Sequence, residues 1–148
     1  MSLLAQLLPP GHVILNAELT SKKRLFEQVG LLVESSRGIA RSTVFDSLFA
    51  REKIGSTGLG QGIAIPHGRI KGLKDAVGVF VRLEQALPFD APDGKPVNLV
   101  FALLVPEQAT ERHLEILSEL AERFSDPDFR DGLIAATDAD TIFRAFAD

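Results

Sequence analysis

The chain has 148 residues and a formal net charge of -4, and 45% of its residues are hydrophobic and 24% charged. This length suits one domain with a single core, and the acidic balance excludes the broad basic surface on which nucleic-acid binding depends. The absence of cysteine excludes disulfides, thiolate metal sites and a cysteine nucleophile.

The sequence shows neither a membrane span nor an internal division. No apolar run approaches the roughly 20 residues that cross a bilayer, and the amino terminus lacks the basic and apolar segments of a secretory signal. No repeat and no linker rich in serine, glycine and proline divides the chain. We therefore expect a cytoplasmic protein without membrane insertion, in which residues 1–148 form a single domain.

Two helices are predicted in the first third of the chain. Residues 20–35 carry apolar side chains at helical spacing, with Thr20 as a candidate N-cap. Residues 41–55 repeat this spacing, and Gly55 can close the second helix. That helix would end directly before the glycine-rich segment GSTGLGQGIAIPHGR, residues 55–69.

Three apolar runs in the middle of the chain are typical of strands. They span residues 62–66, 76–83 and 97–106, and the last two are almost continuously apolar. Such continuity favours strands that are covered on both faces.

The last third of the chain returns to a helical pattern. Residues 110–124 place apolar side chains on one stripe, with Thr110 able to cap the helix. A second helix would open at Asp126, and a third at Asp138 or Asp140. This mixture of helices and strands predicts the α/β class: a single layered domain with a mixed β-sheet and helices on both faces.

The glycine-rich segment presents one histidine on a restricted backbone. Glycines at 58, 60 and 62 permit positive φ angles, and Pro66 stiffens the approach to His67. The spacing fits neither a Walker-type phosphate loop nor a dinucleotide fingerprint. A metal site built from His67, His113 and carboxylates lacks the close ligand spacing that such sites usually show. A third interpretation is a nucleophilic histidine that accepts a phosphoryl group and hands it on.

Two segments of the sequence carry a family resemblance. The motif REKIGSTGLGQGIAIPHGR and the later stretch FDAPDGKPVNLVFALLVPEQATERHLEILSELAERFSD resemble the phosphotransferase-system IIA domains of the fructose/mannitol type. The likeness is strongest to the nitrogen-regulatory branch of that family. It extends over essentially the whole chain.

The resemblance implies roles for three residues and a partner. His67 would accept a phosphoryl group at Nε2 from an HPr-like (NPr) phosphocarrier, with Arg51 and His113 beside the group. Arginine offers a permanently charged fork for phosphoryl oxygens, and a neutral histidine in the first turn of a helix can donate one hydrogen bond. No metal and no cofactor is expected. Further phosphoryl-binding donors, argued from proximity in the sequence only, are Ser56, Thr57, Gly60, Gln61 and Gly62.

The resemblance also implies how such a protein acts. A IIA domain of the nitrogen-regulatory type, with no IIB or IIC sequence within these residues, implies signalling to regulatory target proteins through its phosphorylation state. It would be a phosphotransferase component rather than a stand-alone enzyme. Two alternatives stay open: a sugar-specific IIA component that passes phosphate to a IIB protein, and an interaction module without phosphorylation.

Simpler interpretations exist for the same side chains. Arg51, late in a helix, could merely complement the helix dipole. His113 could be a half-buried helix histidine bonded to a neighbour. His12 has no evident partner in the sequence and is expected to be structural or exposed.

Overall fold

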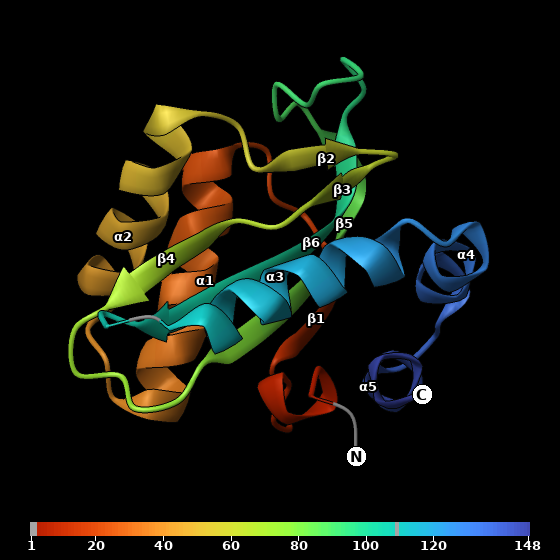
Figure 1. Ribbon diagram of the computed structural model, residues 1–148. Coiled ribbons are helices and arrows are strands. Elements are labelled where there is room, and N and C mark those ends of the chain that lie inside the picture. Colours follow the sequence, from red (N-terminus) through yellow and green to blue (C-terminus); the bar gives the residue numbers. More distant parts are fainter. Residues whose placement is uncertain (1–2, 109) are drawn as a thin grey trace.

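Within residues 3–108 and 110–148, which the computed structural model describes, a mixed six-stranded sheet lies between two layers of helices (Figure 1). The predicted α/β class and the mixed sheet are confirmed. The strands are β1 (Val13–Ala17), β2 (Gly58–Gly60), β3 (Ile63–Ala64), β4 (His67–Ile70), β5 (Val77–Leu87) and β6 (Val97–Pro106). The helices are a short 3-10 helix, η1 (Ala5–Leu7), and α1 (Lys22–Arg37), α2 (Arg41–Ile54), α3 (Glu111–Phe124), α4 (Pro127–Ala135) and α5 (Ala139–Ala147).

The sheet is organised around the long antiparallel pair of β5 and β6. Its order is β1-β5-β6-β3-β2, and β4 also pairs with β6. Both β3 and β4 run parallel to β6, with Ile63 opposite Leu99 and His67 opposite Leu103. Between them Pro66 has no N–H to donate, but its carbonyl accepts a hydrogen bond of 2.8 Å from the Leu103 amide. The chain therefore continues past the proline alongside β6, and His67 is the first residue of β4.

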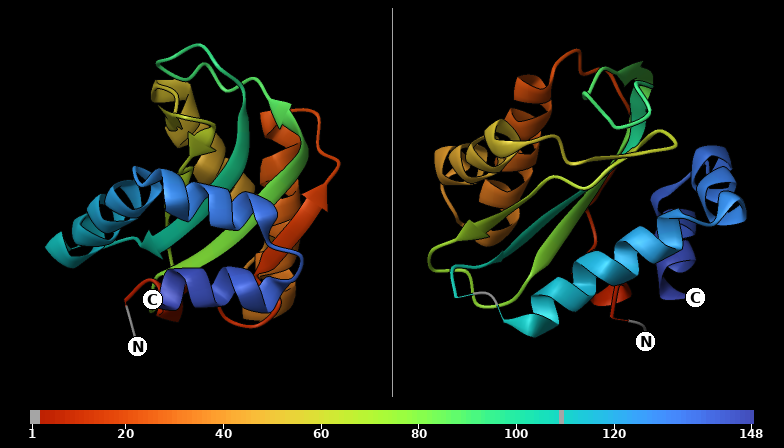
Figure 2. Two further views of the ribbon diagram at one scale, coloured as in Figure 1. Left: turned by 90° about the vertical axis from the view of Figure 1, so that its right-hand side faces the viewer. Right: turned by 45° about the horizontal axis from the view of Figure 1, so that its top comes forward.

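Each face of the sheet carries its own apolar core. Along β6, Val100 and Leu104 pack toward α1 and α2, whereas Phe101 and Leu103 pack toward the C-terminal helices and η1. This alternation follows from the two-residue period of a strand. Figure 2 shows α1 and α2 together on one side of the sheet and α3, α4 and α5 on the other. Helices on both faces explain why residues 76–83 and 97–106 are almost continuously apolar.

The helix starts follow the sequence signals closely. Helix α1 is capped by the Ser21 hydroxyl, so the expected cap at Thr20 is wrong by one residue. The Asp126 carboxylate caps α4 with Pro127 as its first residue, and Asp138 caps α5. Aspartate side chains at these positions accept hydrogen bonds from N–H groups that lack a partner within the helix.

Some elements extend beyond the sequence prediction. Strands β1, β2 and β4 and η1 were not expected, and β5 extends to Leu87, into a region rich in turn residues. His12 is structural: it is 1% exposed, with Nδ1 2.9 Å from the Gly78 carbonyl oxygen and Nε2 2.8 Å from the Ser36 hydroxyl. Of the helices in the described ranges, none is both long and apolar enough to cross a bilayer.

Candidate functional site

One pocket of about 460 Å³ brings together the three residues on which the sequence prediction centres. Arg51 reaches it from α2, His67 from the start of β4 and His113 from the first turn of α3. Apolar side chains, including Ile54 and Leu114, make up much of the remaining lining. The pocket thus combines a cation and two imidazoles with an apolar surround.

His67 has a defined tautomer in its neutral form. Its Nδ1 lies 2.8 Å from the carbonyl oxygen of Ile65. A carbonyl oxygen can only accept a hydrogen bond, so Nδ1 carries the proton and donates it. The Nε2 atom consequently keeps its lone pair. The half-buried ring of His67 therefore has the protonation that a nucleophile at Nε2 requires.

His113 has the opposite tautomer. It is the third residue of α3, and its Nδ1 accepts a hydrogen bond of 2.9 Å from the backbone N–H of Thr110. This bond belongs to a reciprocal cap of the helix, in which the Thr110 side chain also accepts from the amide of His113. Because Nδ1 is an acceptor, the neutral ring carries its proton on Nε2. One pocket thus holds a histidine with a free lone pair and a histidine with a free donor.

Close packing between α2 and β4 positions Arg51. A Cβ atom at Gly68 would overlap the hydroxyl oxygen of Ser47 and lie 3.1 Å from the Ser47 backbone carbonyl carbon, so this contact requires glycine. The Ser47 hydroxyl also donates a 2.8 Å hydrogen bond to the carbonyl of Arg69. Arg51 lies one helical turn after Ser47 and therefore on the same face of α2. The glycine that follows His67 thereby lets the arginine approach it.

The guanidinium of Arg51 has a local role as well. Its Nη1 donates a 2.8 Å hydrogen bond to the carbonyl of Gly55, just beyond the end of α2. Arg51 therefore also interacts with the C-terminal end of its own helix, as the simpler interpretation expected. No other acceptor among the described residues engages the guanidinium, so its remaining N–H groups are free for a ligand.

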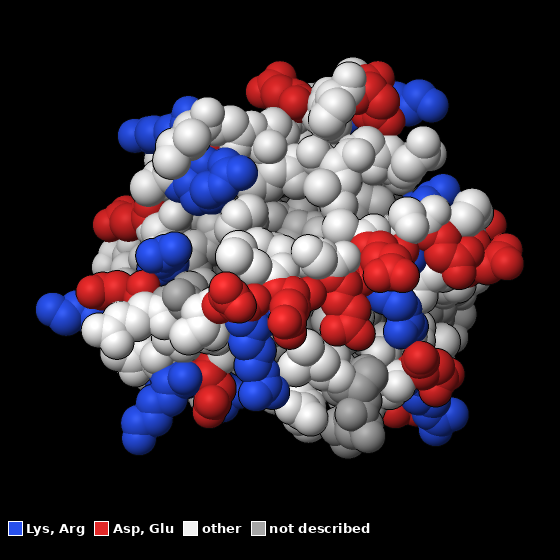
Figure 3. Space-filling model, in the orientation of Figure 1, with Lys and Arg blue, Asp and Glu red and all other residues white. Residues whose placement is uncertain are grey.

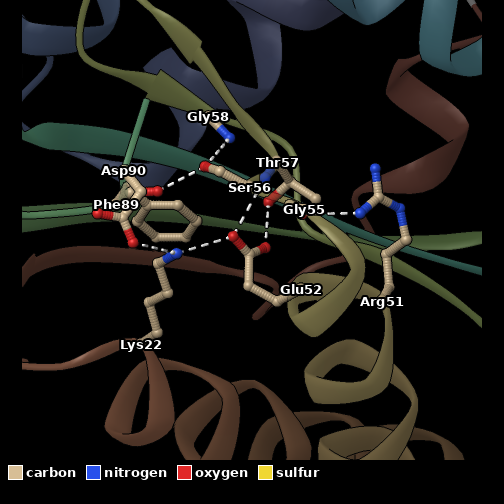
Figure 4. A network of polar contacts seen from close by, with 9 residues as sticks. All are labelled: Lys22, Arg51, Glu52, Gly55, Ser56, Thr57, Gly58, Phe89 and Asp90. Carbon is tan, nitrogen blue, oxygen red and sulfur yellow. Dashed lines mark hydrogen bonds and ion pairs between the residues drawn. The ribbon is translucent and has the colours of Figure 1, made fainter. Parts of the chain in front are cut away.

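A polar network anchors the turn that follows α2 (Figure 4). The Glu52 side chain, only 5% exposed, lies 2.9 Å from Lys22 Nζ on α1. It also accepts hydrogen bonds from the Thr57 amide at 3.1 Å and the Thr57 hydroxyl at 2.6 Å. The Ser56 hydroxyl donates to the carbonyl of Phe89, whose ring lies beneath Lys22. This network holds residues 55–57, and with them the carbonyl that Arg51 contacts.

The structure does not bring the further expected donors to the pocket. Ser56 and Thr57 use their hydroxyls within the network around Glu52. Gly60 ends β2 and residues 61–62 form the turn to β3, where the Gln61 amide donates to the carboxylate of Asp93 at 2.9 Å. None of these residues is part of the pocket lining. Sequence proximity to His67 did not indicate where their side chains and amides point.

Several residues that shape the site were not singled out in the sequence. Glu52 follows Arg51 directly, and Ser47 precedes it by one turn, a spacing that could have marked both. Ile54 and Leu114 are 84% and 64% exposed at the pocket, although they are apolar. Exposed apolar residues at helix ends are a usable signal for an interaction surface.

The charges around the pocket are unevenly distributed. In Figure 3 acidic side chains gather in a row over α3, next to an uncharged area. The acidic residues along this helix are Glu111, Glu115, Glu119 and Glu122. Within the part of the chain that the structure describes, no three His, Asp or Glu residues are grouped so as to hold a metal ion.

The fold and the pocket together define the class of this protein: an α/β protein whose candidate site is centred on two histidines. Over residues 6–148 the sequence matches the family described as phosphoenolpyruvate-dependent sugar phosphotransferase system, EIIA 2. The chain belongs to this family, so the resemblance inferred from the sequence is confirmed.

Several relatives of this chain are named nitrogen regulatory proteins. The chain is 44% identical over 146 residues to the nitrogen regulatory protein of Pseudomonas aeruginosa, covering 98% of this chain and 95% of the relative. Its identity to the protein of that name from Escherichia coli K12 is 42%, covering 91% and 88%. The crystal structure of nitrogen regulatory protein IIA-Ntr from Neisseria meningitidis superposes with a TM-score of 0.93 at 52% identity, covering 98% and 99%.

A more distant solved structure shows how widely the fold is shared. The crystal structure of IIA mannitol from Escherichia coli has a TM-score of 0.77 at 19% identity, covering 93% of this chain and 97% of that one. At this identity the likeness concerns the fold alone.

Proposed function

We propose that this protein is a regulatory phosphocarrier, which accepts a phosphoryl group on His67 from an HPr-like (NPr) phosphocarrier in the cytoplasm. One observation carries the proposal: the free Nε2 of His67 shares a pocket with Arg51 and the Nε2 donor of His113. Membership of the EIIA 2 family supports it. The phosphorylated and unphosphorylated forms then bind regulatory target proteins differently.

The proposed transfer is a displacement at phosphorus between two histidines. The lone pair of His67 Nε2 forms the new N–P bond, and the N–P bond of the carrier breaks, with its electron pair returning to the carrier's ring nitrogen. The His67 ring gains positive charge as its bond forms. The Ile65 carbonyl accepts from Nδ1–H and stabilises that charge, because its dipole already points at the ring.

Arg51 and His113 would bind the phosphoryl oxygens. The free N–H groups of Arg51 offer charge-assisted hydrogen bonds, and His113 offers one N–H from Nε2. Hydrogen bonds to charged groups contribute about 1.5–3 kcal/mol each. For Ser56 and Thr57 we propose a positioning role, because both hydroxyls are already bonded to acceptors of the protein.

The surround of the pocket fits a protein partner. The exposed side chains of Ile54 and Leu114 offer apolar contact, and the acidic row of α3 favours a partner with basic residues around an apolar patch. A phosphoryl group adds about two negative charges beside this surface. Such a change can recruit or repel a target protein without refolding the domain.

The test is the intact mass of the protein after incubation with phosphoenolpyruvate, enzyme I and an HPr-type carrier. Wild type should gain one acid-labile phosphoryl group, and His67→Ala should gain none although its circular dichroism spectrum is unchanged. Subsequent addition of a IIB protein shows whether the group is passed onward, as a sugar-specific component would do. A wild-type protein that gains no mass with any cognate carrier would leave the interaction module as the better description.

A further inference from the structure

A second and larger pocket lies on the other side of the first turn of α3. Its volume is about 860 Å³, within the range of small-molecule sites. It is formed by η1, the end of α1, the connection between β4 and β5, and the start of α3. These segments come together in the lower part of Figure 1.

The charged residues of this pocket are mainly basic. Arg37, Lys74 and Arg112 line it, and Asp75 is its one acidic lining residue. The whole chain has a net charge of -4, so this concentration of cations runs against the general balance of the molecule. A concave surface lined mainly by one sign of charge concentrates ions of the opposite sign.

Among the described residues, no carboxylate forms an ion pair with these three cations, in contrast to Arg41 and Arg144, which lie 2.9 Å from Glu34 and Asp140. Within residues 3–108 and 110–148, no ion pair or side-chain hydrogen bond engages the basic residues of the second pocket. Their charges are therefore free for an anionic ligand.

We propose that this pocket binds a small organic polyanion, with two or three carboxylate or phosphate groups on a short carbon skeleton. The three cations would bind the anionic groups, and Leu7 and Ile116 would contact the skeleton. This combination of apolar contact and a few charged donors is typical of metabolite sites. The pocket is distinct from the site of His67, which does not line it.

His113 connects the two pockets, because it lines both of them. Arg112 precedes His113 in the first turn of α3. An anion bound to Arg112 therefore contacts the same helical turn that holds the Nε2 donor of His113. The proposal goes beyond phosphoryl transfer and does not depend on it. Ligand binding can be measured on the unphosphorylated protein, so either proposal can fail without the other.

The binding experiment uses citrate as the carboxylate probe, fructose 1,6-bisphosphate as the phosphate probe and glucose as the neutral control. Isothermal titration and amide NMR shifts are recorded on the unphosphorylated wild-type protein. At least one polyanion should bind with a millimolar or lower dissociation constant and shift the amides of residues 72–76 and 112–113, and glucose should not. The stronger of the two probes distinguishes a carboxylate site from a phosphate site. Absence of binding by both polyanions would refute the proposal.

Variants locate the bound anion. Arg37→Ala and Arg112→Ala should each weaken binding about tenfold or more, as expected for loss of a hydrogen bond to a charged group. The matched control is Arg24→Ala, an exposed arginine of α1 outside the pocket, which should bind as wild type does. Arg51→Ala should also bind normally. If Arg51→Ala abolishes binding and the pocket variants do not, the anion occupies the site of His67 and the second pocket is not a ligand site.

Discussion

Two histidines of one pocket carry their protons on opposite nitrogens, and the backbone decides this in both cases. A carbonyl faces Nδ1 of His67, whereas an amide N–H faces Nδ1 of His113. The first ring can attack and the second can donate, without any proton moving beforehand. The bond at His113 also caps α3, so this residue has a structural task together with its proposed task in transfer.

Substitution of His113 should separate these two tasks. We expect His113→Ala to lower the free energy of unfolding by about 0.5–2 kcal/mol, the usual effect of losing a cap, and to slow phosphoryl transfer. His113→Glu keeps a side-chain acceptor at the third position of a capping box and should restore stability. Its carboxylate would repel the phosphoryl group, so transfer should stay slow. Urea unfolding and the rate of mass gain measure the two effects, and wild-type transfer by His113→Glu would contradict the donor role.

At the scale of elements, the site depends on how α2 is held against β4 and on how its end is anchored. Gly68 permits the close contact with Ser47, and Glu52 fixes the turn after the helix through Thr57. Glu52 does not line the pocket, yet it holds the turn whose carbonyl accepts from Arg51. We therefore expect it to act as a positioning residue.

A double-mutant cycle tests this role of Glu52. Glu52→Gln removes the charge that pairs with Lys22 and should lower the free energy of unfolding by about 1–3 kcal/mol. It should also slow transfer in the wild-type background. In the Arg51→Ala background it should destabilise the fold without slowing transfer further, because the arginine that it positions is gone. Additive losses of rate would show that Glu52 acts independently of Arg51.

A matched control separates this effect from a general loss of carboxylates. Glu34 also pairs with a cation, Arg41, but it lies at the end of α1 away from the pocket. Glu34→Gln should change the transfer rate little. Its effect on stability should be small, because the pair is largely exposed to solvent.

The elements that were predicted best from the sequence are those whose own pattern of apolar residues identifies them as helix or strand. The helices and the long strands β5 and β6 follow from apolar spacing and continuity. Strand β4 was missed because Pro66 is a signal for the end of a strand, and because Ile70 is the one residue of HGRI that favours strands. Its pairing with β6 determines its conformation, and a partner far away in the sequence leaves no local signal.

The residues of the site were likewise predicted well or badly according to the signal behind each prediction. Arg51, His67 and His113 were expected together through the family resemblance, and the structure brings them to one pocket. Ser56 and Thr57 were expected beside them only because they are near His67 in the sequence. Their hydroxyls instead meet Glu52 and Phe89, which local spacing does not indicate.

At the scale of the whole molecule, the buried side chain of His12 links the sheet to the helix layer that contains α1. Its ring connects the carbonyl of Gly78 on β5 with Ser36 on α1. Nδ1 donates to the carbonyl, so Nε2 of the neutral ring accepts from the serine hydroxyl. Burial lowers the pKa of His12 from the ordinary value of 6.5, and the charge of Arg37 lowers it further, although the bond to Gly78 opposes both.

This depressed pKa predicts how stability depends on pH. Below 6.5 the unfolded chain binds a proton at His12 that the folded chain resists, so the folded state loses stability as the pH falls from 6.5 through the folded pKa. Above about pH 7 both states are neutral at this residue and the contribution is complete. Urea unfolding of wild type between pH 8 and pH 5 should therefore show a declining free energy. His12→Asn, although less stable throughout, should lack that part of the decline. An equal decline in both proteins would assign the pH dependence to other groups.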